Sequence, residues 1–385
     1  MKRSTDRILV THAGALPRPD DLRDLVIARA SGQPYDAALL NRRLREGVSQ
    51  VVRQQVESGI DVVNDGELSK TNFTNYVRER LAGFEARPAG EGAAPLLISG
   101  RDIIDFPEYF AAGGGGFAGS GPSQSQVYCN APLRYVGAAA LQEDITNFRA
   151  ALDGVEVREA FLTAITPGTI EHWLRNDYYR SAEEFVYALA ECLREEYRAI
   201  TDAGFLLQLD DPDLLDGWQM FPAMSVAEYQ RYAEMRVEAL NHALRDIPRE
   251  QIRLHVCWGS FHGPHKHDIP LRDIADVLFK VKAAGYSIEA SNPVHEHEWR
   301  VFDDLKLPEG AALIPGVVGH ASDFIEHPEL VAQRLERYAS LLGRENVIAG
   351  TDCGLGPRVG HAKIVWAKFE SMAEGARIAT KRLSR

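Results

Sequence analysis

Short β-like runs alternate with longer amphipathic segments along almost the whole 385-residue chain. Apolar residues recur at helical spacing between several runs, most clearly over residues 182–204. Such alternation favours a parallel sheet covered by helices, and eight repeats favour a closed barrel over an open doubly wound sheet. We therefore predict an α/β fold, a (β/α)8 TIM barrel in one domain over residues 1–385. The expected strands are Ile8–Val10, Asp61–Asn64, Glu159–Ile165, Phe205–Leu209, Ile252–Val256, Tyr286–Ala290, Ala312–Val318 and Asn346–Gly350.

Two further sequence features bear on this barrel prediction: the loop after the first strand and a Gly-rich stretch. The first run is followed by GALPRP and not by GxGxxG, so a dinucleotide-binding fold gains no support. A stretch from about 85 to 132 is rich in Gly, Ser, Pro and Ala, including ARPAGEGAAP and AAGGGGFAGSGPSQSQ. This composition supplies little apolar surface for a core, so we expect a Gly-rich excursion from the barrel. An active-site lid and a plain surface loop are both open for it.

The composition narrows the class of protein. Hydrophobic residues make up 45% and charged residues 25%, as in ordinary globular domains, and the formal net charge is −12. This acidic balance argues against nucleic-acid partners and against a basic membrane-binding patch. The first residues lack the apolar core of a secretory signal, and no apolar run is long enough to span a bilayer. We expect a cytoplasmic protein.

Four candidate metal ligands each follow a predicted strand. His255 and Cys257 lie in RLHVCWGS, Glu289 in YSIEASN and Cys353 in AGTDCGLG. Residues two apart on a strand share a face, so His255 and Cys257 can point the same way. One imidazole, two thiolates and one carboxylate suit Zn²⁺ better than Mg²⁺, Ca²⁺ or an iron–sulfur cluster. Separate core cysteines, a solvated histidine and a capping carboxylate are the alternative.

Further pieces make a family resemblance visible. In chain order they are THAGALPRP, GIDVVNDGELSKTNFTNYV, TPGTIEHW, LQLDDPDL, HVCWGS, SIEAS, PGVVGHAS and TDCGL. Together they resemble the catalytic C-terminal barrel of cobalamin-independent methionine synthase, over most of the chain apart from the excursion. HxC with DCGL is specific only in combination. The resemblance implies that His255, Cys257, Glu289 and Cys353 bind Zn²⁺, and that a thiol is alkylated as its zinc-bound thiolate.

The resemblance also implies roles around the metal. Glu67 and Asp210 match residues that hold the amino group of homocysteine, although either residue alone reads as a loop carboxylate. His320 matches a proposed proton donor to the leaving group, with a structural histidine as the alternative. Trp173 matches an aromatic that stacks on the methyl donor, with a core role as the alternative. His12 lies in the first loop and is a candidate substrate contact.

The chain also departs from the family pattern. Ala15 stands where a serine commonly contacts the substrate carboxylate, a loss of about 0.5–1.5 kcal/mol for one hydrogen bond. The resemblance begins almost at the first residue, so we expect no counterpart of the family's N-terminal half, which helps to bind the folate donor. The expected partners are a small-molecule thiol and a methyl or alkyl donor, either a methylated folate or a methyl-carrying corrinoid protein.

Three functions are therefore compatible with the sequence. Methyl transfer to homocysteine comes first, and epoxide opening by coenzyme M is the alternative. A non-catalytic zinc-binding protein is the third, but paired CxxC motifs typical of closed structural zinc sites are absent from the sequence. The histidines at 262, 265 and 267 in FHGPHKHDIP favour a solvated loop or a weak adventitious metal patch over a second metal site, and the same applies to His295 and His297.

Overall fold

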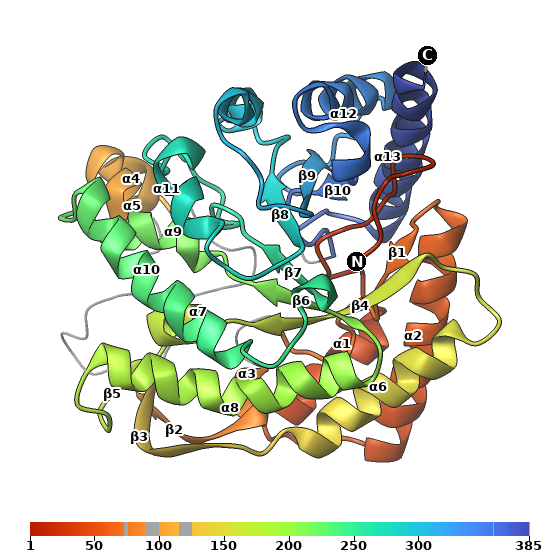
Figure 1. The fold of residues 1–385 in the computed structure, drawn as a ribbon. Helices are drawn as coiled ribbons and strands as arrows, with labels where there is room; N and C mark the ends of the chain where they lie inside the picture. Colours follow the sequence, from red (N-terminus) through yellow and green to blue (C-terminus); the bar gives the residue numbers. More distant parts are fainter. Residues whose placement is uncertain (73–75, 89–99, 115–124, 357, 385) are drawn as a thin grey trace.

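A computed structural model describes residues 1–72, 76–88, 100–114, 125–356 and 358–384 (Figure 1). Seven parallel strands form its central sheet, in the order β1-β4-β6-β7-β8-β9-β10. Each neighbour follows the previous one along the chain, so every crossover is one strand wide, as in a barrel. The strands are β1 (Val62–Val63), β4 (Glu159–Ile165), β6 (Leu206–Asp210), β7 (Ile252–His255), β8 (Gly285–Glu289), β9 (Ala312–Val318) and β10 (Gly350–Thr351).

The N-terminal segment closes this sheet. Val10 forms a parallel bridge with Ala349, just before β10, and its carbonyl accepts the N–H groups of Asp61 and Val62 at 2.9 and 3.1 Å. The first expected strand is therefore present as a single bridge and not as a full strand. The eighth is shorter and later than expected, and Val347 contributes only a bridge to Leu313. The (β/α)8 fold class itself is confirmed.

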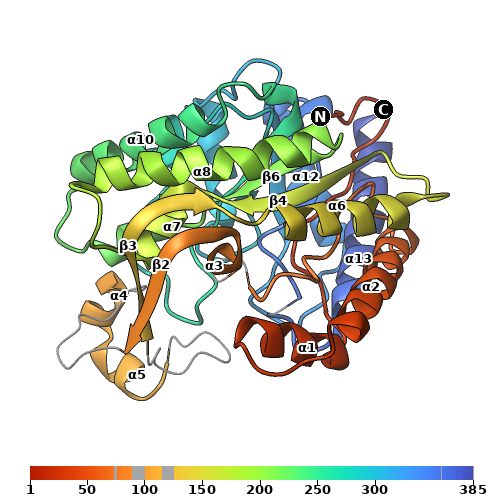
Figure 2. The same ribbon diagram turned by 90° about the horizontal axis from the view of Figure 1, so that it is seen from below.

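Helices cover the outside of the sheet (Figures 1 and 2). Several begin at caps that the sequence supplies, such as Ser225, whose side chain and that of Glu228 form a capping box. No helix in the described part of the chain is long and apolar enough to cross a membrane. The helices are α1 (Asp20–Ala30), α2 (Ala37–Glu57), α3 (Val77–Arg80), α6 (Ala138–Leu152), α7 (Pro167–Trp173), α8 (Ala182–Asp202), α9 (Asp213–Met220), α10 (Val226–Ala243), α11 (Leu271–Leu278), α12 (Pro328–Leu342) and α13 (Ala362–Leu383), with short 3-10 turns η1 (Arg249–Gln251), η2 (Glu296–Asp303) and η3 (Arg344–Asn346).

A buried arginine ties the closing segment to the opposite wall of the barrel. Arg253 of β7 is 1% exposed and donates to Thr11 Oγ1 and to the His12 carbonyl, both at 2.9 Å. Its guanidinium lies 4.2 Å from the centre of the Phe161 ring. Burying a cation is costly, and these two hydrogen bonds offset part of that cost although Nε has no partner among the described residues, so the contacts fix the first loop relative to β7.

The excursion contains more regular structure than its composition suggested. β2 (Leu81–Pro88) and β3 (Ser125–Tyr135) pair antiparallel, and β5 (Arg175–Asn176) adds to β3. Two short helices, α4 (Gly100–Asp105) and α5 (Pro107–Ala111), lie between β2 and β3 in the chain (Figure 2). The paired strands begin and end outside the expected limits of 85 and 132. Most of the two Gly-rich stretches, and with them the question of a lid, fall outside the described residues.

Gly316 of β9 offers a test of packing at the closing edge. A Cβ there would lie 2.5 Å from the Asp352 backbone nitrogen, so the backbone of β9 or of the segment after β10 would have to shift. We expect Gly316→Ala to lower the free energy of unfolding by about 1–3 kcal/mol, measured by urea denaturation. The control is Gly168→Ala in α7, where a Cβ meets only the Arg236 side chain at 3.3 Å. Equal stability of both variants would contradict this packing.

Candidate metal and substrate site

The candidate residues lie at one end of the barrel. Asp210, His255 and Glu289 are the last residues of β6, β7 and β8, and these three strands are neighbours in the sheet. Cys257 and Cys353 each follow a strand by two residues. Because all these strands are parallel, their carboxyl ends meet at the same rim, where barrel enzymes carry their active sites.

Three of the four candidate ligands converge. One donor atom each from His255, Cys257 and Cys353 lies within 4.8 Å of the other two. His255 and Cys257 are both 3% exposed. The His255 Nδ1 faces Ser287 Oγ at 3.2 Å, whereas its Nε2 is buried without a hydrogen-bond partner among the described residues. Ser287 thus orients the ring and leaves Nε2 for a ligand, as a metal-binding histidine requires.

Glu289 lies close by but outside this group of three. Its Oε2 accepts a hydrogen bond from Asn292 Nδ2 at 3.0 Å, whereas its buried Oε1 has no partner among the described residues. Burial, followed by the charges of Asp352 and Cys353, raises the pKa of Glu289 well above its usual range. The ring nitrogen of His255 and the two thiols therefore converge, and Glu289 adds a second unpartnered buried atom within electrostatic reach of Cys257. A cation would relieve this cost, and the donor set fits zinc.

The pKa values of the two thiols are shifted in opposite directions. The hydrogen bond from Cys257 lowers the pKa of Cys353 well below its usual range, against the opposing effect of burial and with further help from His255. The same bond and burial raise the pKa of Cys257. A metal ion bound between the two sulfurs would favour the thiolate form of both.

Asp352 supports the site, and its part was not anticipated from the sequence. Its carboxylate accepts the N–H groups of Ala290 and Ser291 at 2.7 and 3.0 Å and the Ser291 hydroxyl at 2.5 Å. These bonds join the residues after Glu289 to the residue before Cys353. The sequence showed only that an acidic residue precedes the candidate ligand Cys353. It gave no indication that this residue binds Ala290 and Ser291, which lie 62 and 61 residues away in the chain.

Glu67 and Asp210 form the acidic part of the rim. Both are buried, and burial followed by the charge of Glu67 raises the pKa of Asp210 to about 7. Glu67 adopts a left-handed backbone with φ of 57°, and its Oε1 accepts from Thr163 Oγ1 at 3.0 Å. A Cβ on Gly14 would lie 2.4 Å from the same oxygen, so the first loop passes close to this carboxylate. The strained backbone is consistent with a functional position.

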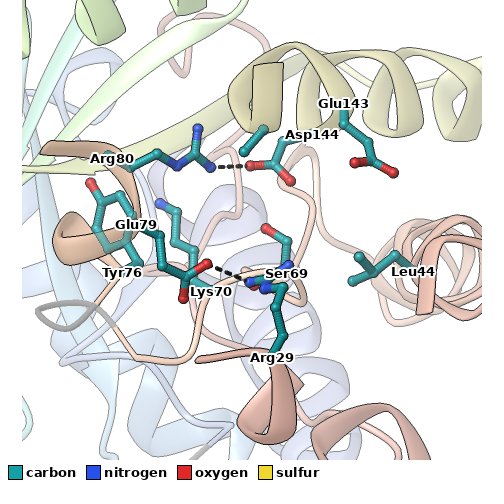
Figure 3. A pocket seen from close by; sticks show the side chains of 10 residues that line it. Arg29, Leu44, Ser69, Lys70, Tyr76, Glu79, Arg80, Glu143 and Asp144 are labelled. Carbon is teal, nitrogen blue, oxygen red and sulfur yellow. Dashed lines mark hydrogen bonds and ion pairs between the residues drawn. The ribbon is translucent and has the colours of Figure 1, made fainter. Parts of the chain in front are cut away.

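Lys70 partly balances these acids. Its Nζ donates to Thr163 Oγ1 at 2.8 Å, the hydroxyl that also reaches Glu67. Lys70 also lines a small cavity of about 30 Å³ between the loop after β1 and helices α2, α3 and α6 (Figure 3). The ion pairs Arg29–Glu79 at 2.9 Å and Arg80–Asp144 at 2.5 Å neutralise that cavity. None of the metal candidates lines it.

The remaining candidates differ in how many of their side-chain nitrogens already have hydrogen-bond partners. His320 is 5% exposed, its Nδ1 has no partner among the described residues, and burial lowers its pKa to about 4. In His12 both ring nitrogens are engaged: Nδ1 accepts the Gly14 N–H at 3.2 Å and Nε2 meets Gln55 Oε1 at 2.7 Å. Trp173 ends α7, and its Nε1 donates to Asp213 at 3.3 Å. Their contacts with substrates stay predictions.

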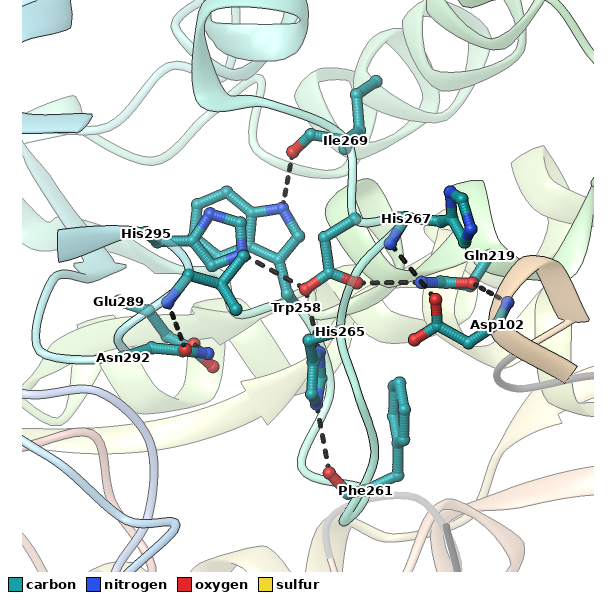
Figure 4. A network of polar contacts seen from close by, with 12 residues as sticks. Asp102, Gln219, Trp258, Phe261, His265, His267, Ile269, Glu289, Asn292 and His295 are labelled. Carbon is teal, nitrogen blue, oxygen red and sulfur yellow. Dashed lines mark hydrogen bonds and ion pairs between the residues drawn. The ribbon is translucent and has the colours of Figure 1, made fainter. Parts of the chain in front are cut away.

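The histidines after Cys257 and Glu289 correct one expectation. His262 is exposed, but His265 and His295 are buried and both bind the carboxylate of Asp268 (Figure 4). They are therefore not part of a solvated loop. Among the described residues they also join no second metal cluster. Their spacing in the sequence carried no sign of the shared partner, because Asp268 and His295 come together only by folding.

Comparison with known proteins identifies the family. The sequence model described as "Cobalamin-independent synthase, Catalytic domain" matches residues 100–377. The chain belongs to this family. Relatives named methionine synthase include that of Thermococcus kodakarensis, 25% identical with 97% of this chain and 93% of the relative covered. That of Saccharolobus solfataricus is 24% identical, with coverages of 97% and 96%.

Solved structures agree on the fold of the cobalamin-independent synthase family. A B12-independent methionine synthase from a Shewanella species, in complex with selenomethionine, matches with a TM-score of 0.74 at 20% identity and covers 98% of this chain and 99% of its own. A methyltransferase from Methanosarcina mazei matches with a TM-score of 0.53 at 15% identity, over 97% of this chain and 94% of its own. The family resemblance expected from the sequence is thus confirmed, and the chain is a methyltransferase of the methionine synthase type.

Metal content tests the ligand group. We expect purified protein to carry about one zinc per chain, and Cys257→Ser or Cys353→Ser to lose most of it, because each removes a thiolate ligand. Elemental analysis by mass spectrometry measures this. Cys192→Ser is the matched control, because Cys192 is a core residue of α8. Full zinc retention in both ligand variants would refute the site.

Proposed function

We propose that this chain is a zinc-dependent enzyme that transfers a methyl group to the sulfur of homocysteine. The observation that carries the proposal is the convergence of His255, Cys257 and Cys353 at the barrel rim that also holds Glu67 and Asp210. At this rim the metal site would bind the sulfur of an aminothiol, and the buried carboxylates would bind its ammonium group. Family membership supports methyl transfer, and the methionine synthases among the relatives support homocysteine as the acceptor.

The proposed ligands are His255, Cys257, Glu289 and Cys353. When bound, Zn²⁺ supplies a Lewis acid that lowers the pKa of a substrate thiol and makes its sulfur a nucleophile near neutral pH. The protein contributes orientation, because Ser287 holds the His255 ring and Asn292 holds one oxygen of Glu289. It also excludes water, since the donor residues other than Cys353 are at most 3% exposed.

Glu67 and Asp210 are the proposed partners of the substrate ammonium. Two carboxylates buried together are costly, and a bound cation would lower that cost. The charge of Lys70 already acts on Asp210, whereas the Lys70 ammonium is linked to the Glu67 carboxylate through the Thr163 hydroxyl. An ammonium placed between the carboxylates would therefore be stabilised directly. This supports an aminothiol over an uncharged thiol.

The other end of homocysteine is a carboxylate, and Ala15 offers no side-chain donor for it. A Cβ on Gly354 would lie 2.9 Å from the Ala15 Cβ, so Ala15 lies beside the loop of Cys353. We infer that backbone N–H groups of this first loop bind the carboxylate in place of a hydroxyl. His12 stabilises the same loop through its bond to the Gly14 N–H.

The proposed roles on the donor side rest on His320 and Trp173. The buried imidazole of His320, with Nδ1 free among the described residues, is the proposed proton donor to the leaving group; because burial lowers its pKa to about 4, this role requires a nearby negative charge, such as that of Cys353, to stabilise the protonated ring. Trp173 is the proposed stacking surface for the donor ring. A methylated folate and a methyl-carrying corrinoid protein are both compatible as donors. Cytoplasmic location likewise stays a prediction from composition.

One observation favours a second candidate, alkyl transfer to an anionic thiol such as coenzyme M. Burial lowers the pKa of the Arg358 guanidinium, whereas the charges of Cys353 and Cys257 act to raise it, so this cation lies within electrostatic reach of the sulfur pair. A guanidinium at that position would attract a sulfonate. In this alternative the substrate has no cationic group to pair with the carboxylates of Glu67 and Asp210, so it ranks second.

Thiol binding separates the two candidates. Titration of the zinc-loaded protein should give tighter binding for homocysteine than for coenzyme M. Glu67→Gln and Asp210→Asn should each weaken homocysteine by about 10-fold or more, because a charge-assisted hydrogen bond is lost. Binding of the anionic thiol should stay level or improve. Tighter binding of coenzyme M, lost in both variants, would overturn amine recognition.

Steady-state kinetics test His320. His320→Gln should lower kcat by about 10²–10⁴-fold, because proton transfer to the leaving group loses its donor. Zinc content and homocysteine affinity should not change. His262→Gln, which replaces an exposed histidine, is the matched control. A kcat within twofold of the wild type in His320→Gln would show that the proton comes from elsewhere.

A further inference from the structure

Asp268 is the centre of a buried polar network that includes His265, His295 and Gln219, which are labelled in Figure 4. Its side chain is 1% exposed. One carboxylate oxygen accepts from His265 Nδ1 at 2.8 Å and from His295 Nε2 at 3.1 Å. The other accepts from Gln219 Nε2 of α9 at 2.9 Å. A carboxylate buried with three donors is a strong tie between the segments that supply them.

His295 connects Asp268 to both ligand loops. Its ring stacks on that of Trp258, the residue after Cys257, with centres 3.5 Å apart and planes at 12°. Its backbone N–H donates at 2.9 Å to the carbonyl of Asn292, the residue whose side chain holds Glu289. The remaining ring nitrogen meets Glu298 Oε2 at 2.8 Å. Rotation of this imidazole would therefore disturb both loops.

His265 secures the segment between Cys257 and Asp268. Its Nε2 donates to the Phe261 carbonyl at 3.1 Å, and the two rings stack with centres 4.0 Å apart. Its backbone is left-handed, with φ of 51°, which a non-glycine residue keeps only when its contacts hold it. Both nitrogens of His265 and of His295 face acceptors. Burial is the largest single effect and lowers the pKa of each ring, but the hydrogen bonds to Asp268 and the other acceptors, together with the nearby negative charges, raise it overall.

The Gln219 contact extends the network to the excursion. Gln219 Oε1 accepts the backbone N–H of Asp102 in α4 at 3.2 Å, and Asp102 Oδ1 accepts the backbone N–H of His267 at 3.1 Å. Arg101, beside it, donates to the carbonyls of Trp218 and Phe221, each at 2.9 Å. The carboxylate of Asp268 thus connects the segment that contacts α4 with the loops that carry the candidate ligands.

We propose that Asp268 is a positioning residue of the metal site, which holds the loops of Cys257 and Glu289 in their relative places through His265 and His295. Asp268 is not a ligand itself, and it belongs to no cluster of candidate ligands among the described residues. The proposal rests on the proposed function in one respect, that Cys257 and Glu289 bind zinc. Outer partners of this kind commonly change metal affinity by about 10- to 100-fold.

The test measures zinc affinity of metal-free protein by competition with a chromophoric chelator. Asp268→Ala should weaken zinc binding by about 10- to 100-fold. Asp268→Asn keeps the shape but loses the charge, and should weaken it by a smaller factor. In the cobalt-substituted protein, both variants should shift the visible ligand-field bands, which report ligand geometry and which a loss of general stability would leave in place.

Phe148→Leu provides the control for stability. Phe148 is fully buried in α6 and contacts Phe205 with ring centres 4.9 Å apart, away from both ligand loops. It should lower Tm without changing zinc affinity or the cobalt spectrum. Wild-type zinc affinity in Asp268→Ala overturns the positioning role, and if that variant does not fold, wild-type affinity in Asp268→Asn overturns it. Failure of the wild type to bind zinc would instead overturn the proposed function.

Discussion

Closure of the sheet by the N-terminal segment is the constraint on which the candidate site depends. Val10 bridges Ala349 on one side and accepts hydrogen bonds from Asp61 and Val62 on the other. Arg253 then ties the following residues to β7 through the barrel interior. Because the first loop continues directly from this segment, the positions of His12, Gly14 and Ala15 at the rim depend on the same bonds.

The rim concentrates groups that are costly to bury. Asp210 and Glu67 share one part, and two thiols with Glu289 share another. The protein offsets some of this cost itself, through Lys70, Gln208 and Asn292. His255 Nε2 and Glu289 Oε1 keep no hydrogen-bond partner among the described residues, and in the proposed function a metal would satisfy these atoms and a cationic substrate would satisfy the acid pair. Binding and stability are thus linked at one end of the barrel.

The polar network around Asp268 joins three segments that lie far apart in the chain. Asp268 follows β7, His295 follows β8, and Asp102 belongs to the excursion. In proteins where ligands come from separate strands, the distances between them are only as well defined as the loops that carry them. A buried carboxylate with several donors defines such loops better than apolar packing alone, because hydrogen bonds are directional.

The sequence by itself determined the barrel class, the rim on which the candidates lie and the family, because strand periodicity, strand ends and the HVC and DCGL pieces are local. It also predicted that His255, Cys257 and Cys353 come together, since residues after parallel strands meet at one edge; their role as metal ligands, with Glu289, stays a prediction. Only the tertiary structure decided the reduction of the first strand to a bridge, the burial of His265 and His295, and the supporting role of Asp352. These depend on contacts between residues distant in sequence, such as Asp352 with Ser291, and a side chain's partner across the fold leaves no periodic trace in the chain.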